Sequence, residues 1–245
     1  MCGTIEVEQD VRAENLHQSG HLREHFAHHG VRVIGLLGSP GSGKTTLLEN
    51  ILPALSKKMR VAVIEGDVAT ELNEIIFALR ESALTRFALL IVHICHVSAF
   101  QGGQLGVQAV QINTDGACHL DTAMVKKALE EIDLDAIDLL IIENVGNLVC
   151  PVGFPLGETL RLAVISAAEG EDKPLKYPSA VLHTDAMVVT KTDIAGFTRV
   201  DPGKMAEYAR QINPDIQVFF SGFDKDGGWN GAAGDGQSLA DYLIG

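Results

Sequence analysis

Short apolar runs alternate with amphipathic segments along most of this chain. The runs are rich in Val, Ile and Leu and predict buried β-strands. They are Val31–Leu37, Arg60–Glu65, Val107–Ile112, Asp138–Glu143, Met187–Thr190 and Gln217–Phe220. Helical spacing of apolar residues predicts helices that include Thr45–Lys57, Leu120–Ile132, Pro202–Ile212 and Ser238–Ile244. This alternation is typical of an α/β fold, with a mostly parallel sheet and helices on both faces.

No Pro- or Ser-rich linker divides the 245 residues. We therefore expect one large domain over residues 31–245, preceded by an extension over residues 1–30. The extension carries several histidines, which fall largely on one face if it is helical. They are His17, His21, His25, His28 and His29. Two histidines one turn apart can chelate a divalent ion, and an ordinary exposed polar face is the alternative.

The formal charge of −13 argues against nucleic acid as a main partner, because phosphate backbones require a basic surface. The longest apolar run, Phe87–Cys95, falls well short of the ~20 residues needed to span a bilayer. The first residues are acidic and do not form a signal peptide. The widely spaced cysteines do not suggest a disulfide framework. They are Cys2, Cys95, Cys118 and Cys150. We expect a cytoplasmic protein without a membrane partner.

The segment Gly38–Thr45 matches the phosphate-binding loop pattern G-x-x-x-x-G-K-S/T between a predicted strand and a predicted helix. Glycines let the backbone fold around a polyphosphate with its N–H groups directed inward. The following helix adds its positive end. Lys44 is expected to neutralise the β- and γ-phosphates, and the Thr45 hydroxyl to bind Mg²⁺. The residues expected to bind a nucleoside triphosphate here are Gly38, Gly41, Ser42, Gly43, Lys44, Thr45 and Thr46.

Two carboxylates follow predicted strands at the same edge of the sheet. Asp67 comes after the second strand, and Glu143 ends the fourth. Each is either an ordinary strand-end carboxylate or an acid that binds Mg²⁺, and the phosphate loop favours the second interpretation. Gly146 follows Glu143 by three residues, and its N–H is placed to sense a γ-phosphate. With Lys44 and Thr45, these acids form the expected catalytic set.

The fifth predicted strand leads into Thr190–Asp193. Asp193 can accept both N–H groups of the guanine edge, while the stem of Lys191 covers the base. Adenine presents the wrong donor pattern and would leave the carboxylate unpaired. The usual guanine pattern begins with Asn, so Thr190 departs from it, although Thr also occurs in guanine-binding relatives of the signal-recognition class. Guanine is favoured.

A Cys-His pair and a further Cys follow successive predicted strands of one sheet. Cys118 and His119 come after the third strand, and Cys150 comes after the fourth. Thiolate and imidazole ligands suit Ni²⁺ or Zn²⁺. Three ligands leave a four-coordinate shell incomplete, and a symmetric dimer can complete it. The alternative is two ordinary buried cysteines and a helix-capping histidine.

Three blocks together resemble the HypB family of hydrogenase maturation GTPases, which are SIMIBI-class P-loop proteins. The blocks are Gly38–Thr45, Gly116–Asp121 and Glu143–Pro151. The resemblance extends from about Val31 to the C-terminal helix, and the second and third blocks are far more specific than the first. It implies a GTPase that uses GTP and Mg²⁺, with slow intrinsic turnover.

The resemblance also implies a role for the metal. In this family GTP binding promotes dimerisation, and a metal lies at the dimer interface on the matching Cys-His pair, here Cys118 and His119. Nickel then passes to the NiFe-hydrogenase large subunit precursor, with a HypA-type nickel chaperone as a further partner. Cys150 would link metal binding to nucleotide state.

The chain also departs from the family pattern. Many members begin with a Cys-x-x-Cys-Gly-Cys nickel site, whereas here only Cys2 remains. Between Asp67 and Cys118 lies a long apolar insertion over residues 71–104, which contains a second pair, Cys95-His96. In the family, an acidic residue that moves on GTP binding occurs in this part of the sequence. Here the residue that comes nearest to its position is Asn73.

Other functions remain open from the sequence. The chain is alternatively a nickel- or zinc-binding storage module whose GTPase switching is impaired by the insertion. A urease-type nickel accessory GTPase is a further alternative, although such proteins carry Cys-Pro-His and here Pro151 is followed by Val152. A small-molecule kinase with the same loop would leave Thr190–Asp193 unexplained.

Overall fold

The computed structural model describes residues 3–68, 107–234 and 236–245. Its centre is a sheet with the strand order β3-β2-β4-β1-β5-β6-β7-β8-β9. In chain order the strands are β1 (Arg32–Gly38), β2 (Val61–Asp67), β3 (Gln108–Asn113), β4 (Leu139–Glu143), β5 (Leu160–Ser166), β6 (Ala186–Thr190), β7 (Gln217–Phe223), β8 (Trp229–Gly234) and β9 (Gln237–Ser238). Pairing is parallel from β3 through to β7, and β8 and β9 add an antiparallel edge.

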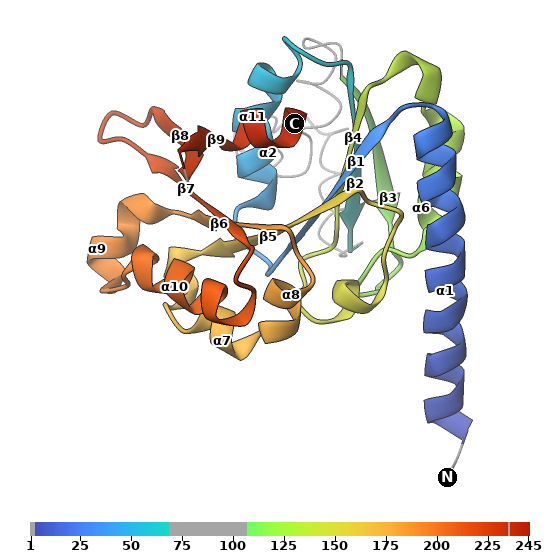
Figure 1. The fold of residues 1–245 in the computed structure, drawn as a ribbon, viewed down its shortest axis with the longest axis horizontal. Coiled ribbons are helices and arrows are strands. Elements are labelled where there is room, and N and C mark those ends of the chain that lie inside the picture. Colours follow the sequence, from blue (N-terminus) through green and yellow to red (C-terminus); the bar gives the residue numbers. More distant parts are fainter. Residues whose placement is uncertain (1–2, 69–106, 235) are drawn as a thin grey trace, which may run out of the picture.

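Helices cover both faces of this sheet (Figure 1). The longer ones are α1 (Gly3–His28), α2 (Lys44–Leu55), α6 (Thr122–Ala128), α10 (Pro202–Ile212) and α11 (Leu239–Ile244). Shorter ones are α7 (Lys173–Lys176), α8 (Pro178–Leu182) and α9 (Ala195–Thr198). The 3-10 turns are η1 (Leu129–Glu131), η2 (Leu134–Ala136), η3 (Cys150–Gly153), η4 (Ala167–Glu169) and η5 (Thr192–Ile194).

The core lies in layers above and below the sheet. On one face, α2 and α11 pack on alternate residues of the central strands, including the buried pair Leu36 and Ile141. On the other face, α1 and α6 pack on β2 and β4, and α10 packs on β5 and β6. Alternation along a strand sends successive side chains to opposite faces. The central strands are therefore apolar on both faces, as in other parallel sheets.

The predicted fold class is confirmed: the sheet is mostly parallel, with helices on both faces. Strand β5 was not predicted, because Arg161 interrupts its apolar run. The Ala- and Gly-containing strand β8 was also missed. The predicted helix Leu120–Ile132 is too long: regular α-helix covers only α6, and the chain tightens into η1 before Ile132.

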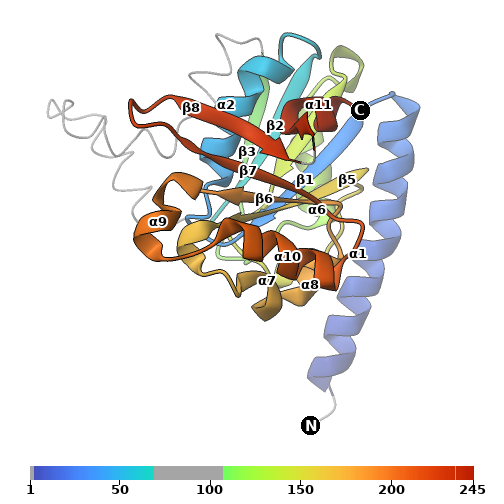
Figure 2. The same ribbon diagram turned by 60° about the vertical axis from the view of Figure 1, so that its left-hand side comes forward.

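The amino-terminal extension forms the long helix α1, whose N-terminal end projects past the sheet in both views (Figures 1 and 2). Leu22 and Phe26 are buried in the layer that covers β2 and β4. The histidines of α1 lie near one another, and the rings of His17 and His21 are 4.6 Å apart. The insertion over residues 71–104, with Cys95-His96 and Asn73, and the residue Cys2 lie outside the described residues.

In the described part of the chain, no helix combines the length and the apolar character needed to cross a membrane.

Candidate functional site

The phosphate loop follows β1, the strand between β4 and β5 at the centre of the sheet. Gly41 and Gly43 have φ values of 70° and 92°, a conformation that glycine adopts without strain. A Cβ at Gly38 would lie 2.6 Å from both the Ser42 hydroxyl and the Val164 carbonyl oxygen. The Ser42 hydroxyl is buried without a hydrogen-bond partner among the described residues. Only a compact backbone fits here, and it leaves one buried polar group that a bound phosphate can satisfy.

Lys44 is the first residue of α2, and its side chain folds back over the loop. Its ammonium group donates to the carbonyl oxygens of Gly38 (3.3 Å) and Ser39 (3.4 Å). Burial lowers the pKa of Lys44, and among the carboxylates that oppose this shift Glu143 has the largest effect. A phosphate in the loop would replace the carbonyl contacts with a charged partner.

Oxygen ligands gather beside Lys44. The Thr45 hydroxyl lies 2.9 Å from Glu143 Oε1. Glu65 is paired with Glu143 in the register of β2 and β4, and Asp67 follows two residues later on the same face. Burial raises the pKa of Glu143, opposed chiefly by Lys44. Hydroxyl and carboxylate oxygens are the ligands that Mg²⁺ prefers, so this group fits that ion.

Glu65 was not among the predicted ligands. Burial, followed by Glu143 and Asp67, raises its pKa to about 7. The carboxylates of Glu143 and Asp67 thus act on Glu65 by charge repulsion, which a divalent cation would relieve. The sequence held one signal for Glu65: its spacing of two from Asp67 puts both side chains on one face of a strand.

The expected base-binding residues follow β6, and one of them lies beside the end of β7. Lys191 has a left-handed backbone with φ 56°, and its ammonium group donates to the Gly41 carbonyl oxygen at 2.7 Å. Asp193 accepts from the backbone N–H of Phe223 at 3.2 Å. A Cβ at Gly222 would lie 2.7 Å from an Asp193 carboxylate oxygen. The end of β7 therefore supports the Asp193 side chain. This support from β7 was not predicted from the sequence.

Thr190 replaces the expected Asn and is buried beneath the phosphate loop. Its hydroxyl donates to the Ser42 carbonyl oxygen at 2.5 Å. It therefore ties β6 to the loop, which accounts for a short hydroxyl side chain at this position.

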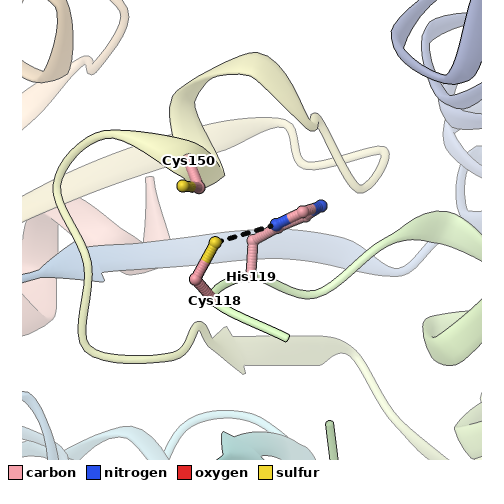
Figure 3. A group of neighbouring side chains, drawn as sticks. All are labelled: Cys118, His119 and Cys150. Atoms are coloured by element: carbon pink, nitrogen blue, oxygen red, sulfur yellow. Dashed lines mark hydrogen bonds between the residues drawn. The ribbon is translucent and has the colours of Figure 1, made fainter. Parts of the chain in front are cut away.

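The structure brings Cys118, His119 and Cys150 together (Figure 3). One ligand atom from each lies within 4.8 Å of the others, and Cys118 Sγ is 3.6 Å from His119 Nδ1. They converge because β3 and β4 both flank β2, which places the segments after β3 and β4 beside each other. Two sulfur atoms and one imidazole suit Ni²⁺ or Zn²⁺, and the cluster has the donor set for such an ion.

The surroundings of the cluster are mixed. Cys118 is exposed, Cys150 is half-buried, and the His119 ring packs on Phe154 with 3.8 Å between centroids. Hydrogen bonding with Cys150 is the first cause that raises the pKa of Cys118. Burial lowers the pKa of His119, which Asp121 opposes and Arg12 of α1 reinforces. A neutral imidazole is the form that binds metal.

The segment between β4 and Cys150 is in contact with the phosphate loop. Asn147 pairs with Gly38 through an isolated antiparallel bridge. A Cβ at Gly146 would lie 2.9 Å from Pro40 Cα, so only glycine allows this approach. The segment that carries Cys150 therefore runs directly along the phosphate loop.

A parallel sheet with this loop after its first strand, and with acids at the ends of the next strands, defines a P-loop nucleotide-binding protein. Residues 32–220 match the family model described as CobW/HypB/UreG, nucleotide-binding domain. The chain belongs to this family, within its HypB branch.

Several relatives carry the name hydrogenase maturation factor HypB. That of Azotobacter chroococcum is 40% identical over 216 residues, which cover 87% of this chain and 62% of the relative. The probable HypB of Methanocaldococcus jannaschii is 35% identical, with 92% of this chain and 93% of the relative covered. This chain thus spans about three fifths of the first of these relatives and nearly all of the second.

A solved structure is similar as well. The crystal structure of HypB from Helicobacter pylori in complex with nickel has a TM-score of 0.68 and 32% identity, and the match covers 84% of this chain and 86% of that one.

Proposed function

We propose that this chain is a GTPase that binds nickel and delivers it to the NiFe-hydrogenase large subunit precursor. The observation that carries the proposal is the Cys118–His119–Cys150 cluster, which is linked to the phosphate loop through the bridge between Asn147 and Gly38. The names of the relatives and the nickel-bound H. pylori protein support it. A HypA-type chaperone as the nickel donor, and a cytoplasmic location, belong to the same proposal.

On the nucleotide side, residues 31–245 form the GTPase domain of this proposal. Lys44 and the loop N–H groups hold the β- and γ-phosphates, and Asp193 with Lys191 selects guanine. Thr45, Asp67 and Glu143 bind Mg²⁺, which supplies positive charge against the developing phosphate charge. The residues act by positioning and by charge stabilisation, without a covalent intermediate. We expect intrinsic turnover below roughly 1 s⁻¹, the low end for ordinary enzymes.

On the metal side, the exposure of Cys118 leaves the cluster open to a second copy of the chain. Val149, beside Cys150, is 64% exposed and offers an apolar contact at the same place. A GTP-dependent dimer would bring two clusters together and complete the coordination of one shared ion.

Native mass spectrometry with Ni²⁺ tests this proposal. The protein is compared with GDP and with a non-hydrolysable GTP analogue. We expect a dimer with shared nickel only with the analogue, and loss of that nickel in Cys118→Ala. If mass and nickel content are the same with both nucleotides, the proposal is wrong, and a nickel- or zinc-binding module without switching takes its place.

A further inference from the structure

The two chain segments that carry the metal ligands are joined by asparagine side chains. Asn147 makes the central connection. Its amide nitrogen donates to the Cys118 carbonyl oxygen at 3.1 Å. Its amide oxygen accepts from the backbone N–H groups of Val149 (2.8 Å) and Cys150 (3.4 Å). One side chain thus spans from the backbone of one cysteine ligand to that of the other.

The backbone of the same residue belongs to the nucleotide site. Asn147 is bridged to Gly38, the first residue of the phosphate loop. The preceding Gly146 packs against Pro40 so closely that a Cβ would lie 2.9 Å from the Pro40 Cα. A displacement of the phosphate loop therefore moves Asn147, and with it the hydrogen bonds that hold Cys118 and Cys150.

A second asparagine joins the same two segments without touching the phosphate loop. Asn15, buried on α1, donates to the Pro155 carbonyl oxygen at 2.8 Å and accepts from the Thr122 N–H at 3.0 Å. It bridges the segment after His119 to the segment after Cys150. Both of its hydrogen-bond partners belong to these segments. Asn15 is therefore a matched control, because it joins the same two segments through residues outside the phosphate loop.

We propose that Asn147 is the positioning residue through which the phosphate loop sets the separation of Cys118 and Cys150, so that nucleotide state changes the affinity of this cluster for a divalent transition-metal ion. The inference rests on the proposed function and deepens it. Outer hydrogen bonds that orient ligands change metal affinity by about 10–100-fold. Small shifts at one site become functional when the connecting elements have discrete packed arrangements.

The test is a Ni²⁺ titration of the full chain by equilibrium dialysis, with the thiolate-to-nickel absorption as a second readout. Wild type, Asn147→Ala and Asn15→Ala are each measured with saturating GDP and with a saturating non-hydrolysable GTP analogue. The deciding quantity is the ratio of the two nickel affinities for each protein. Saturation keeps any change in nucleotide affinity out of that ratio.

We expect Asn15→Ala to lower both nickel affinities by about 10-fold and to keep the wild-type ratio. Asn147→Ala should bring the ratio to about one. Asn147→Asp keeps the oxygen that accepts from Cys150 but loses the donor to Cys118, so it should also lose the ratio. This variant decides the matter if Asn147→Ala shows no cooperative thermal transition.

The contrary results are separable. If wild type itself binds nickel equally with both nucleotides, the proposed coupling fails, and this inference fails with it. If wild type shows a ratio that Asn147→Ala and Asn147→Asp retain, the inference alone is wrong. A ratio lost equally in Asn15→Ala also overturns it, because the loss would then reflect loosened segments rather than the connection to the phosphate loop.

Discussion

The Thr45 hydroxyl donates to Glu143 Oε1 at 2.9 Å, although the two residues lie 98 positions apart in the chain. Thr45 is the second residue of α2, the helix after β1, and Glu143 is the last residue of β4, the neighbouring strand. The fold therefore places a hydroxyl and a carboxylate together at the point where Lys44 closes the phosphate loop. This contact provides the first test of the nucleotide site.

We predict that Thr45→Ala weakens GDP binding in Mg²⁺ by at least about 10-fold, because a hydrogen bond or ligand at a charged group contributes about 1.5–3 kcal/mol. In EDTA the same variant should bind GDP within about 3-fold of wild type. Fluorescence titration with a labelled GDP measures both affinities. Ser179→Ala, which removes an exposed hydroxyl on α8, is the control. An equal loss with and without Mg²⁺ would contradict a metal role for Thr45.

Asp193 provides a test of base specificity. A carboxylate accepts two N–H groups from guanine, whereas an Asn side chain would place an N–H donor against one of them. We predict that Asp193→Asn lowers GTP affinity by at least about 10-fold and raises affinity for xanthosine triphosphate, which has a carbonyl at that edge. Competition titrations with GTP, XTP and ATP measure this. Asp215→Asn, exposed before β7, is the control, and unchanged preference for GTP in Asp193→Asn would exclude base recognition by Asp193.

Much of the fold follows from local patterns. The apolar alternation and the phosphate-loop motif were enough to predict a parallel sheet with ligands at its carboxyl edge. Strand β5 escaped because Arg161 interrupts its apolar run; that side chain pairs with the buried Glu158 at 3.2 Å. Strand β8 forms because it pairs with β7. Pairing of that kind is set by tertiary structure, which overrides weak local propensity.

In the candidate site, as in the fold, local sequence patterns predict some features and only the tertiary structure shows the others. The positions of Cys118, His119 and Cys150 after strand ends could be predicted from the sequence, and the resemblance to the HypB family favoured them as metal ligands. Partnerships between distant residues could not. Asn147 reads in the sequence as an ordinary loop residue, and only the packing of two loops gives it contacts to Gly38 and Cys118. Glu65 is recognised as a candidate metal ligand only from its register with Glu143 and from its burial, and both come from the structure.

Glu65 predicts a pH dependence of stability in the metal-free, nucleotide-free protein. Its folded pKa of about 7 lies above its ordinary value of 4.5. Between these values the folded chain binds more protons than the unfolded chain, so the free energy of unfolding falls as pH rises. Glu65→Gln should remove part of this fall, on the order of 1–3 kcal/mol. Glu143, which remains, retains the rest.

Urea unfolding in EDTA at pH 5 and pH 7.5 measures this difference for Glu65→Gln, with Glu207→Gln on the exposed face of α10 as the control. The Glu65 variant should gain stability relative to wild type at the higher pH, and the control should follow wild type at both. If the free energy of unfolding of Glu65→Gln equals that of wild type at both pH values, the pKa of this carboxyl is not raised in the folded protein.

Phe26 tests whether the amino-terminal helix is part of the folded domain. Its side chain is fully buried and packs with Leu22 in the layer over β2 and β4. We predict that Phe26→Ala costs about 3–5 kcal/mol in the free energy of unfolding, because it leaves a cavity in that layer. Leu16→Ala on the same helix removes a side chain that is 62% exposed and should change stability by at most about 0.5 kcal/mol. Urea denaturation compares the two. If both variants behave like wild type, α1 is an independent extension, and deleting it would test whether its histidines bind metal without disturbing the domain.

If only Phe26→Ala is destabilised, α1 is part of the folded domain. Deleting α1 would then also remove Asn15 and disturb the metal cluster, so the histidines must be tested by substitution instead.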